Sequence, residues 1–375
     1  MRFPEFSREW HNHPLTDFMS FKNGMNPDVK RFGHGTKFIS VMDILNNQFI
    51  YYDDIRASVE VIDGDLETYG VNYGDILFQR SSETLEDVGQ ANVYLDSKPV
   101  VFGGFVIRGK SKGNYNPLFF RYLLASPAVR KRIITKGAGA QHFNIGQDGL
   151  SKVCVDIPCK QEQEKIAKLL SLLDERMATQ SKIIEDLKKL KSAISLNVLH
   201  SGAWEQFKIK DIAKIGRGRV ISSIEISQQK NPTYPVYSSQ TSNDGIMGYL
   251  DDYMFEGEYI SWTTDGANAG TVFYRNGKFN CTNVCGLLKL RKEFDTHFVS
   301  LVLAEATKKY VSINLANPKL MNNTMGNIQI RLPKLEEQKR VSIVFRELQG
   351  LWVVYNSLLT NYTKQKQYLL SQMFI

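Results

Sequence analysis

Cysteine is scarce in this chain, and none of it is spaced for metal binding. A zinc ribbon or finger is not expected, because no C-x-x-C pair occurs. No apolar run approaches the ~18 residues that a membrane span needs, and the start, Met1-Arg2-Phe3-Pro4-Glu5, does not have the form of a secretory signal. We therefore expect a cytoplasmic protein that avoids membranes and keeps its thiols reduced. The four cysteines are Cys154, Cys159, Cys281 and Cys285.

Acidic side chains are absent from one long stretch. Between Ser97 and Gln147 there is no aspartate or glutamate, whereas nine residues are basic. They are Lys98, Arg108, Lys110, Lys112, Arg121, Arg130, Lys131, Arg132 and Lys136. A shorter acid-free stretch runs from Gly266 to Lys292. In a chain of net charge +8, bases gathered on one face would neutralise phosphates and attract a polyanion. The alternative is that folding interleaves them with the acids of residues 43–96.

The chain contains one unit twice. Residues 157–166 recur as residues 332–341, a shift of 175 positions, and this alignment continues without a gap to the end of the chain. Upstream the repeat goes on with insertions, and Trp10 aligns with Trp204. This period is far longer than the ~20–50 residues of a solenoid repeat, so each copy is domain-sized. Such a chain imitates a two-fold dimer whose halves differ in sequence.

Each copy ends in a segment that predicts a long amphipathic helix. Within residues 161–199 apolar side chains recur three and four residues apart, Pro158 precedes the start, and Gly202 is placed to end the helix. The second copy shows the same stripe from Val341 to Met373. Such a helix would be roughly 58 Å long. We expect the two helices to pack antiparallel as a coiled coil. The alternative is that each lies flat on its own head.

The remainder of each copy predicts an α/β head. Runs of β-branched and aromatic residues indicate strands at residues 75–78, 99–102, 104–107, 153–157 and 328–332. Short helices are indicated at residues 119–124 and 298–304. The expected fold class is α+β: two α/β heads in pseudo-two-fold repeat, joined by two long antiparallel helices. The expected order is a first head, 1–157, a central helix, 158–203, a second head, 204–332, and a C-terminal helix, 333–375.

Three segments resemble catalytic motifs, but their sequence context does not fit catalysis. Residues 104–111 match the phosphate-loop pattern G-x-x-x-x-G-K-[ST], but their interior is Phe-Val-Ile, which is typical of a strand. Residues 116–119 resemble the N-P-P-[FY] motif of adenine methyltransferases without its second proline. Residues 337–339 have a nuclease-like E-x-K spacing at what we expect to be the exposed start of a helix. The six histidines show no ligand spacing. We expect a non-catalytic chain that itself holds no metal or cofactor.

Two proline-led signatures carry a resemblance to a known family. They are residues 158–163 and 333–338, each followed by a long helix and preceded by a head that opens with a tryptophan. In this order the chain strongly resembles the specificity subunit of type I restriction–modification systems. The resemblance implies two target-recognition domains, each reading half of a bipartite sequence in double-stranded DNA, and a coiled-coil ruler between them. It also implies two modification (methyltransferase) subunits and two restriction subunits as partners, which would carry S-adenosylmethionine, ATP and Mg²⁺.

Side chains suited to phosphates and base edges are the candidate DNA-binding residues, with amides for adenine and arginines for guanine. In the first head they are Arg80, Ser81, Ser82, Lys110, Lys112, Arg130, Lys131, Arg132, Lys136, Gln141, His142 and Asn144. In the second head they are Arg217, Arg219, Ser238, Ser239, Gln240, Thr263, Thr264, Asp265, Asn268, Asn317 and Lys319. The loop 135–144 is the strongest candidate, because its small residues let backbone approach DNA closely. The alternative function is a two-headed protein–protein adaptor, whose DNA binding would be weak and insensitive to salt.

Overall fold

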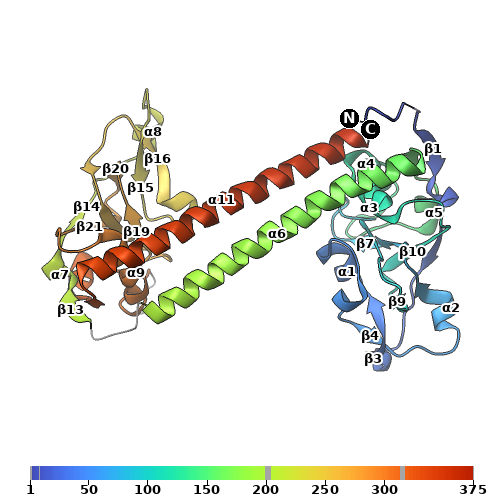
Figure 1. Ribbon diagram of the computed structural model, residues 1–375, viewed down its shortest axis with the longest axis horizontal. Coiled ribbons are helices and arrows are strands. Elements are labelled where there is room, and N and C mark those ends of the chain that lie inside the picture. Colours follow the sequence, from blue (N-terminus) through green and yellow to red (C-terminus); the bar gives the residue numbers. More distant parts are fainter. Residues whose placement is uncertain (1, 8, 199–203, 313–316, 375) are drawn as a thin grey trace. The chain divides into compact units, whose positions relative to one another are not determined.

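The computed structural model describes residues 2–7, 9–198, 204–312 and 317–374. The chain divides into two compact units, the first made of Met1–Ile183 with Asn356–Ile375 and the second of Ile184–Tyr355. Each unit therefore contains one head and one part of each long helix (Figure 1). In the described parts of the chain, no helix combines the length and the apolar character that a membrane span requires.

Two four-stranded sheets form the frame of the first head. One is antiparallel, with the strand order β2 (Met19–Asn23), β10 (Val106–Ser111), β6 (Ile76–Gln79) and β8 (Ala91–Val93). The other has the order β4 (Ser58–Val59), β3 (Phe32–Ile39), β9 (Val100–Phe102) and β5 (Gly70–Val71), with β3 parallel to β9. Two further pairs are β1 (His11–Pro14) with β12 (Cys154–Ile157), and β7 (Ser81–Ser82) with β11 (Phe143–Asn144). The helices are α1 (Val41–Asn46), α2 (Asp65–Tyr69), α3 (Pro117–Ala125), α4 (Pro127–Ile134) and α5 (Gln147–Ser151).

The second head repeats this frame. Its antiparallel sheet has the order β14 (Ala213–Arg217), β21 (Cys285–Leu290), β18 (Tyr259–Thr263) and β19 (Val272–Arg275). Its other sheet has the order β16 (Ile246–Leu250), β15 (Tyr234–Tyr237), β20 (Lys278–Cys281) and β17 (Phe255–Glu256), with β15 parallel to β20. Strand β13 (Glu205–Lys208) pairs with β22 (Gln329–Leu332), as β1 pairs with β12. The helices are α7 (Ile209–Ile212), α8 (Ser223–Ser227), α9 (Thr296–Ala306) and α10 (Asn322–Asn327). The prediction of two mixed heads in repeat is confirmed.

Two segments that mimic catalytic motifs are structural elements. Residues 106–111 of the apparent phosphate loop are strand β10, which pairs with β2 on one side and β6 on the other. The Asn-Pro-Leu-Phe segment begins helix α3: the side-chain Oδ1 of Asn116 accepts a hydrogen bond from the Phe119 amide at 2.9 Å. Asp295 caps α9 in the same way, accepting from the Phe298 amide at 2.7 Å. Both caps satisfy amides that a helix start leaves unpaired.

A buried glutamine in each proline-led signature fastens a long helix to its head. Gln163, 3% exposed, donates through Nε2 to the Pro158 carbonyl at 3.0 Å and accepts at Oε1 from the Asn116 amide, also at 3.0 Å. Gln338, 1% exposed, makes the same two bonds, to the Pro333 carbonyl at 2.8 Å and from the Asp295 amide at 3.0 Å. The repeated sequence therefore encodes a repeated joint between the helix start and the cap of α3 or α9.

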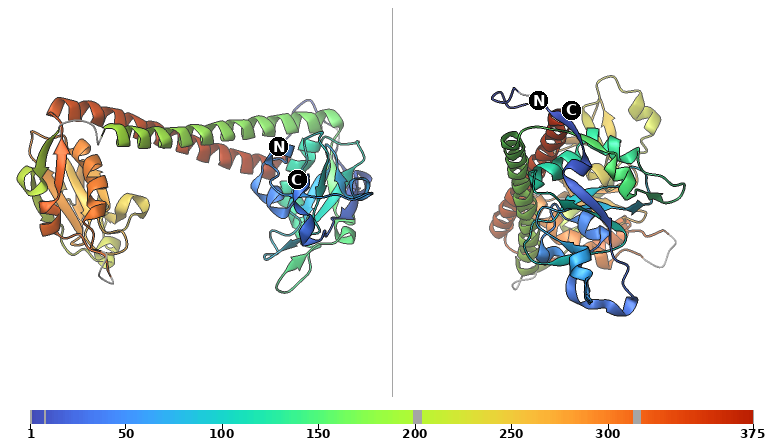
Figure 2. Two further views of the ribbon diagram at one scale, coloured as in Figure 1. Left: turned by 90° about the horizontal axis from the view of Figure 1, so that it is seen from below. Right: turned by 90° about the vertical axis from the view of Figure 1, so that its right-hand side faces the viewer.

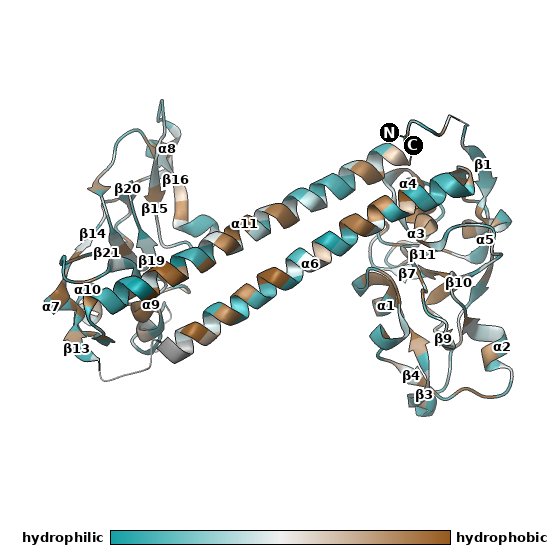
Figure 3. Ribbon diagram, in the orientation of Figure 1, coloured by the Kyte–Doolittle hydropathy of each residue, from teal (hydrophilic) through white to brown (hydrophobic). Residues whose placement is uncertain are grey.

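The long helices are α6 (Lys160–Val198) and α11 (Leu335–Met373). Alternating apolar and polar bands run along both (Figure 3). In the first unit Ile166 and Leu170 of α6 share a hydrophobic core with Leu369 and Met373 of α11 and with the α3 side chains. The predicted end of α6 at Gly202 lies outside the described residues.

The two helices run in opposite directions within each unit. In the first unit Asp174 of α6 meets Lys366 of α11, with Nζ to Oδ1 at 2.5 Å. In the second unit Lys191 of α6 meets Gln349 of α11, with Nζ to Oε1 at 3.1 Å. These contacts are equivalent under the shift of 175 positions, which takes Asp174 to Gln349 and Lys191 to Lys366. The predicted antiparallel pairing is confirmed in each unit, and the helix contacts follow the pseudo-two-fold repeat.

The equivalent contacts differ in burial and charge. The Asp174 side chain is only 4% exposed and also accepts a hydrogen bond from the Tyr122 hydroxyl at 2.7 Å. Gln349 is exposed and neutral. A carboxylate that is taken out of water needs a cation far more than an exposed amide does.

Replacing Lys366 by methionine should therefore destabilise the first unit by about 3 kcal/mol, because it leaves a buried carboxylate without its cation. The matched variant Lys191→Met removes an exposed contact to a neutral partner and should cost less than about 1 kcal/mol. Urea unfolding followed by amide hydrogen exchange would measure the free energy of unfolding of each unit separately. Equal losses in the two variants would contradict a special role for the buried pair.

Candidate nucleic-acid interface

A hairpin projects from the first head where α4 ends. Its arms meet at Ala138 and Asn144, whose amides and carbonyls exchange hydrogen bonds at 2.9 and 2.8 Å. The returning arm, β11, pairs with β7, which follows the central strand β6. At the exposed tip Gly139 has φ +146°, and a Cβ there would lie 2.0 Å from the His142 carbonyl oxygen. The hairpin, visible in Figure 2, therefore depends on this glycine.

We call the pairing of Asn144 with both Ala138 and Ser81 the junction of the first head. The second head has an equivalent junction. Ser312 bridges to Lys319, and Lys319 bridges to Asp265, which follows the central strand β18. Lys319 is the repeat equivalent of Asn144, 175 positions further on. Of the residues between Ser312 and Lys319, 313–316 lie outside those that the structure describes. The two heads thus place different side chains, an amide in one and an amine in the other, on the same backbone frame.

Several first-head candidates lie at or near the hairpin with exposed side chains. Lys131 lies on α4, and Lys136, Gln141 and His142 lie on the loop that follows. Asn144 is exposed at the hairpin base, where its Oδ1 accepts a hydrogen bond from the Ser81 hydroxyl. Apart from Lys131 and Ser81, these residues belong to the loop 135–144, which is the strongest candidate in the sequence.

Other basic candidates of the first head are held by protein groups. Arg132 forms an ion pair with Asp156 at 2.8 Å and donates to the Cys154 carbonyl at 3.0 Å. Arg130 donates to the carbonyls of Glu86 and Val88, both at 2.8 Å. These arginines secure strand β12 and the loop after β7.

The remaining first-head candidates are spread more widely. Arg80 donates to the Gly104 carbonyl at 3.2 Å, and Ser82 accepts from the Thr84 amide at 3.3 Å. Lys110 is exposed at the end of β10. Lys112 is exposed but donates to the Thr16 carbonyl at 2.6 Å. Lys110 and Lys112 therefore lie apart from the residues at the hairpin, although all of them belong to the same acid-free stretch of the sequence.

Among the second-head candidates, two threonines and two arginines serve the fold. Thr263 and Thr264 are 1% and 0% exposed, and the Thr264 hydroxyl donates to the Val284 carbonyl at 2.9 Å. Arg217 donates to the Asn322 side chain at 2.9 Å, and Arg219 is paired with Glu225. Fewer of the second-head candidates are exposed. Asn268 and Asn317 are exposed. Lys319 Nζ lies 3.7 Å from Asp265 Oδ1.

No group of three or more histidine, cysteine, aspartate or glutamate side chains is arranged to hold a metal ion in the described ranges. Cys281 and Cys285 are buried in the second head, whereas Cys159 is exposed.

Comparison with known proteins identifies the family. The model of the type I restriction modification DNA specificity domain matches residues 7–189 and again residues 202–349. The chain belongs to the type I restriction–modification DNA specificity family. Its two heads therefore lie in two specificity domains, in agreement with the resemblance noted from the sequence.

Individual relatives agree with this assignment. A Mycoplasma pneumoniae protein that bears the name of a type I specificity subunit is 38% identical over 197 residues, which are 52% of this chain and 82% of that protein. The fold is similar to that of the Mycoplasma genitalium S subunit, with a TM-score of 0.68, 16% identity, and coverage of 100% and 99% of the two chains. A chain solved in work on complex assembly and conformational transition of the type I R–M system has a TM-score of 0.57 at 12% identity, with 98% and 97% covered.

One loop distinguishes the second specificity domain from the first. After β15 the chain passes through residues 238–245, whereas in the first domain β3 is followed by helix α1. Asn243 and Asp244 in this loop have φ values of 48° and 53°. Asparagine and aspartate tolerate this left-handed conformation better than other side chains with a Cβ. The loop exposes Thr241, Ser242, Asn243 and Asp244.

The buried side chain of Arg275 holds this loop in place. Its side chain is 2% exposed, and Nη1 donates to Asp244 Oδ2 at 2.8 Å. Its Nε donates to the Ser261 hydroxyl at 3.0 Å, and the guanidinium lies 3.6 Å from the centre of the Tyr237 ring. A planar cation with several donors suits this combination of stacking and hydrogen bonding. Sequence reasoning had counted Arg275 only as one charge of the acid-free stretch.

The loop also reaches the junction that bears Asp265 and Lys319. The Thr263 hydroxyl donates to the Ser239 carbonyl at 3.5 Å, and the Ser238 amide donates to the Gly245 carbonyl at 2.9 Å. The Gln240 side chain donates to the Ile246 carbonyl. The candidates Ser238, Ser239 and Gln240 therefore hold the loop in shape, and the tip beyond them, residues 241–244, is exposed.

Replacing Arg275 by methionine should loosen the loop without unfolding the second domain, because it removes the charge-assisted bond to Asp244. We expect amide hydrogen exchange in residues 238–246 to become at least about tenfold faster, a change of about 1.4 kcal/mol. Arg217→Met, which removes an arginine of the same domain whose hydrogen bonds go to Asn322 and Met321 and not to this loop, is the control. Unchanged exchange in the loop would show that Arg275 does not hold it.

Proposed function

We propose that this chain is the DNA-reading subunit of a type I restriction–modification complex, each head reading one half of a bipartite target. The observation that carries the proposal is the repeated junction, in which one backbone frame presents Asn144 in the first head and Lys319 in the second. Two unlike readers in one chain suit two unlike half-sites separated by base pairs that neither head contacts. We further propose that α6 and α11 set that separation.

Base recognition is assigned to the exposed polar groups at each junction. In the first head these are Gln141, His142 and Asn144, with Lys136 beside them. In the second head they are the tip 241–244, together with Asn268, Asn317 and Lys319. Amide side chains can bond both edge groups of adenine, and lysine can bond the acceptors of guanine. The proposal leaves out Arg130, Arg132, Thr263 and Thr264, which the fold uses internally.

Phosphate contact is assigned to lysines with few protein partners. Lys131 and Lys136 are exposed near the hairpin, and Lys110 is exposed at the end of β10. Lysine is a compact, flexible charge that suits phosphates, whose contacts position a protein without reading sequence.

The long helices are the proposed docking surface for partner subunits. Helix α11 exposes Ile343, Val344, Leu351, Val353 and Val354 within the second unit. Exposed apolar side chains gathered on a helix are typical of an interaction surface. We propose that two modification subunits dock on the helices and that two restriction subunits join for cleavage. On this proposal the chain is non-catalytic and cytoplasmic, and S-adenosylmethionine, ATP and Mg²⁺ belong to the partners.

Exchanging residues 15–150 for the corresponding head of another family member tests the assignment of half-sites. One half of the recognised sequence should change and the other should stay, because each head reads alone. Methylation-site mapping in cells that carry the hybrid with its modification partner would measure this. If both halves change, or if neither does, the modular proposal fails.

The double variant Lys131→Ala, Lys136→Ala tests phosphate contact. Binding to all sequences should weaken alike, and the slope of log affinity against log salt should flatten by up to ~0.9 per lost contact. Arg132→Ala is the control, because its guanidinium is committed to Asp156 and should affect stability more than the salt slope. A loss confined to one target sequence would make the lysines base readers. A salt slope near zero for the unaltered chain would favour the protein–protein adaptor.

A further inference from the structure

The first turn of α6 carries a carboxylate that another segment of the chain covers. The Glu162 side chain is 0% exposed and forms a bidentate ion pair with Arg2. The Nε–Oε1 and Nη2–Oε2 distances are both 2.6 Å. The indole Nε1 of Trp10 lies 3.4 Å from Oε1. Arginine is the side chain that matches both carboxylate oxygens at once. In the first unit, therefore, the site formed by Glu162 and Trp10 receives an arginine.

The residues next to Arg2 complete this covering segment. Phe3 packs against the main core of the first unit, and Lys165 Nζ lies 4.7 Å from the centre of its ring. Glu5 forms an ion pair with Lys165. An arginine followed by an aromatic residue is thus the pattern that covers the start of α6.

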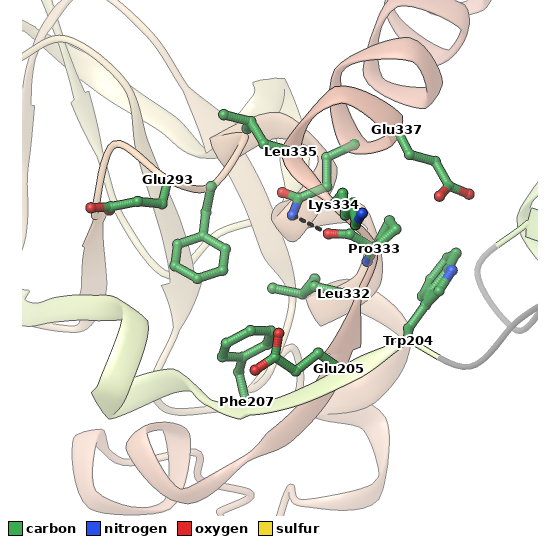
Figure 4. A pocket seen from close by; sticks show the side chains of 11 residues that line it. Trp204, Glu205, Phe207, Glu293, Leu332, Pro333, Lys334, Leu335 and Glu337 are labelled. Atoms are coloured by element: carbon green, nitrogen blue, oxygen red, sulfur yellow. Dashed lines mark hydrogen bonds between the residues drawn. The ribbon is translucent and has the colours of Figure 1, made fainter.

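The second unit has the same carboxylate and indole. Glu337 is the repeat equivalent of Glu162, and Trp204 is the equivalent of Trp10. Both line a cavity of about 510 Å³ at the start of α11, together with Phe207, Phe294 and Pro333 (Figure 4). Glu337 is exposed, and no described basic side chain lies within ion-pair distance of it. The second unit thus contains the site without a described arginine.

Three carboxylates and one lysine line this cavity, whereas the equivalent cavity at the start of α6 is lined by two carboxylates, Glu9 and Asp17, and one lysine, Lys160. Glu205 and Glu293 line it beside Glu337, with Lys334 as the opposing charge. The positions that correspond to Glu205 and Glu293 in the first unit are His11 and Asn114. The excess of carboxylates over lysine at the cavity of the second unit favours a cationic ligand. In sequence, the residues just before Trp204, 196–203, contain neither arginine nor lysine, so this stretch offers no equivalent of Arg2.

We propose that the cavity at the start of α11 binds a segment of a partner polypeptide in which an arginine precedes an aromatic residue. The guanidinium pairs with both oxygens of Glu337 and lies against Trp204, while the aromatic ring contacts the apolar wall formed by Phe207, Phe294 and Pro333. Charge complementarity and the equivalent contact of Arg2 carry this assignment. It does not depend on DNA recognition by the heads.

A labelled peptide with the sequence of residues 1–6, Met-Arg-Phe-Pro-Glu-Phe, is the probe. Fluorescence anisotropy with the full chain should show saturable binding that weakens about tenfold in Glu337→Gln, the loss of one charge-assisted pair. The matched control Glu336→Gln removes the same charge from the neighbouring position and should bind normally. A peptide with lysine in place of arginine should bind more weakly, because an ammonium group cannot form the bidentate ion pair.

Three outcomes would overturn the proposal. The first is no binding at millimolar peptide. The second is binding that Glu337→Gln and Glu336→Gln weaken alike, which would reflect general charge. The third is binding that survives Glu337→Gln but is lost in Glu162→Gln, which would place the peptide in the first unit, where it displaces the chain's own segment. The assay contains no DNA, so its result is distinguishable from failure of the proposed DNA-reading function.

Discussion

The buried glutamine at the start of each long helix is the contact on which the rest of the arrangement depends. Gln163 and Gln338 each bond the carbonyl of a signature proline and the amide of the residue that caps α3 or α9. A buried amide left unpaired would cost about 1–3 kcal/mol, so both bonds hold the helix start to the head. Because the same joint occurs twice, the orientation of each helix start on its head follows from a short repeated sequence.

The frame and the loops of the heads serve different purposes. Strand order, the parallel pairs β3–β9 and β15–β20, and the junctions at Asn144 and Lys319 are common to both heads. The loops attached to that frame differ, with α1 in the first head and the loop held by Arg275 in the second. A fixed frame with exchangeable loops is what a family needs if its members are to bind different DNA sequences, because loops tolerate change that a packed core does not.

The repeat also shows where two-fold symmetry is relaxed. Asp174 and Gln349 occupy equivalent places, yet one is a buried carboxylate paired with lysine and the other is an exposed amide. Glu162 and Glu337 differ similarly, since one is covered by Arg2 and the other is exposed. In both cases the first unit holds the buried ion pair. The halves of the chain are therefore alike in backbone and unlike in the surfaces they offer to partners.

The sequence by itself determined the duplication, the long helices, the strands that precede them and the family. These features depend on local periodicity and on residues that recur at a constant shift, both of which survive without knowledge of contacts. It could not determine which basic side chains are available. Arg130 and Arg132 count as DNA-facing charges in the sequence, but folding brings the Glu86 and Cys154 carbonyls and Asp156 to them. Arg275 is likewise one charge among several until Asp244, Ser261 and Tyr237 surround it. Tertiary structure decided these roles, because the partner of a long, charged side chain lies far away in sequence and only the packed backbone brings the two together.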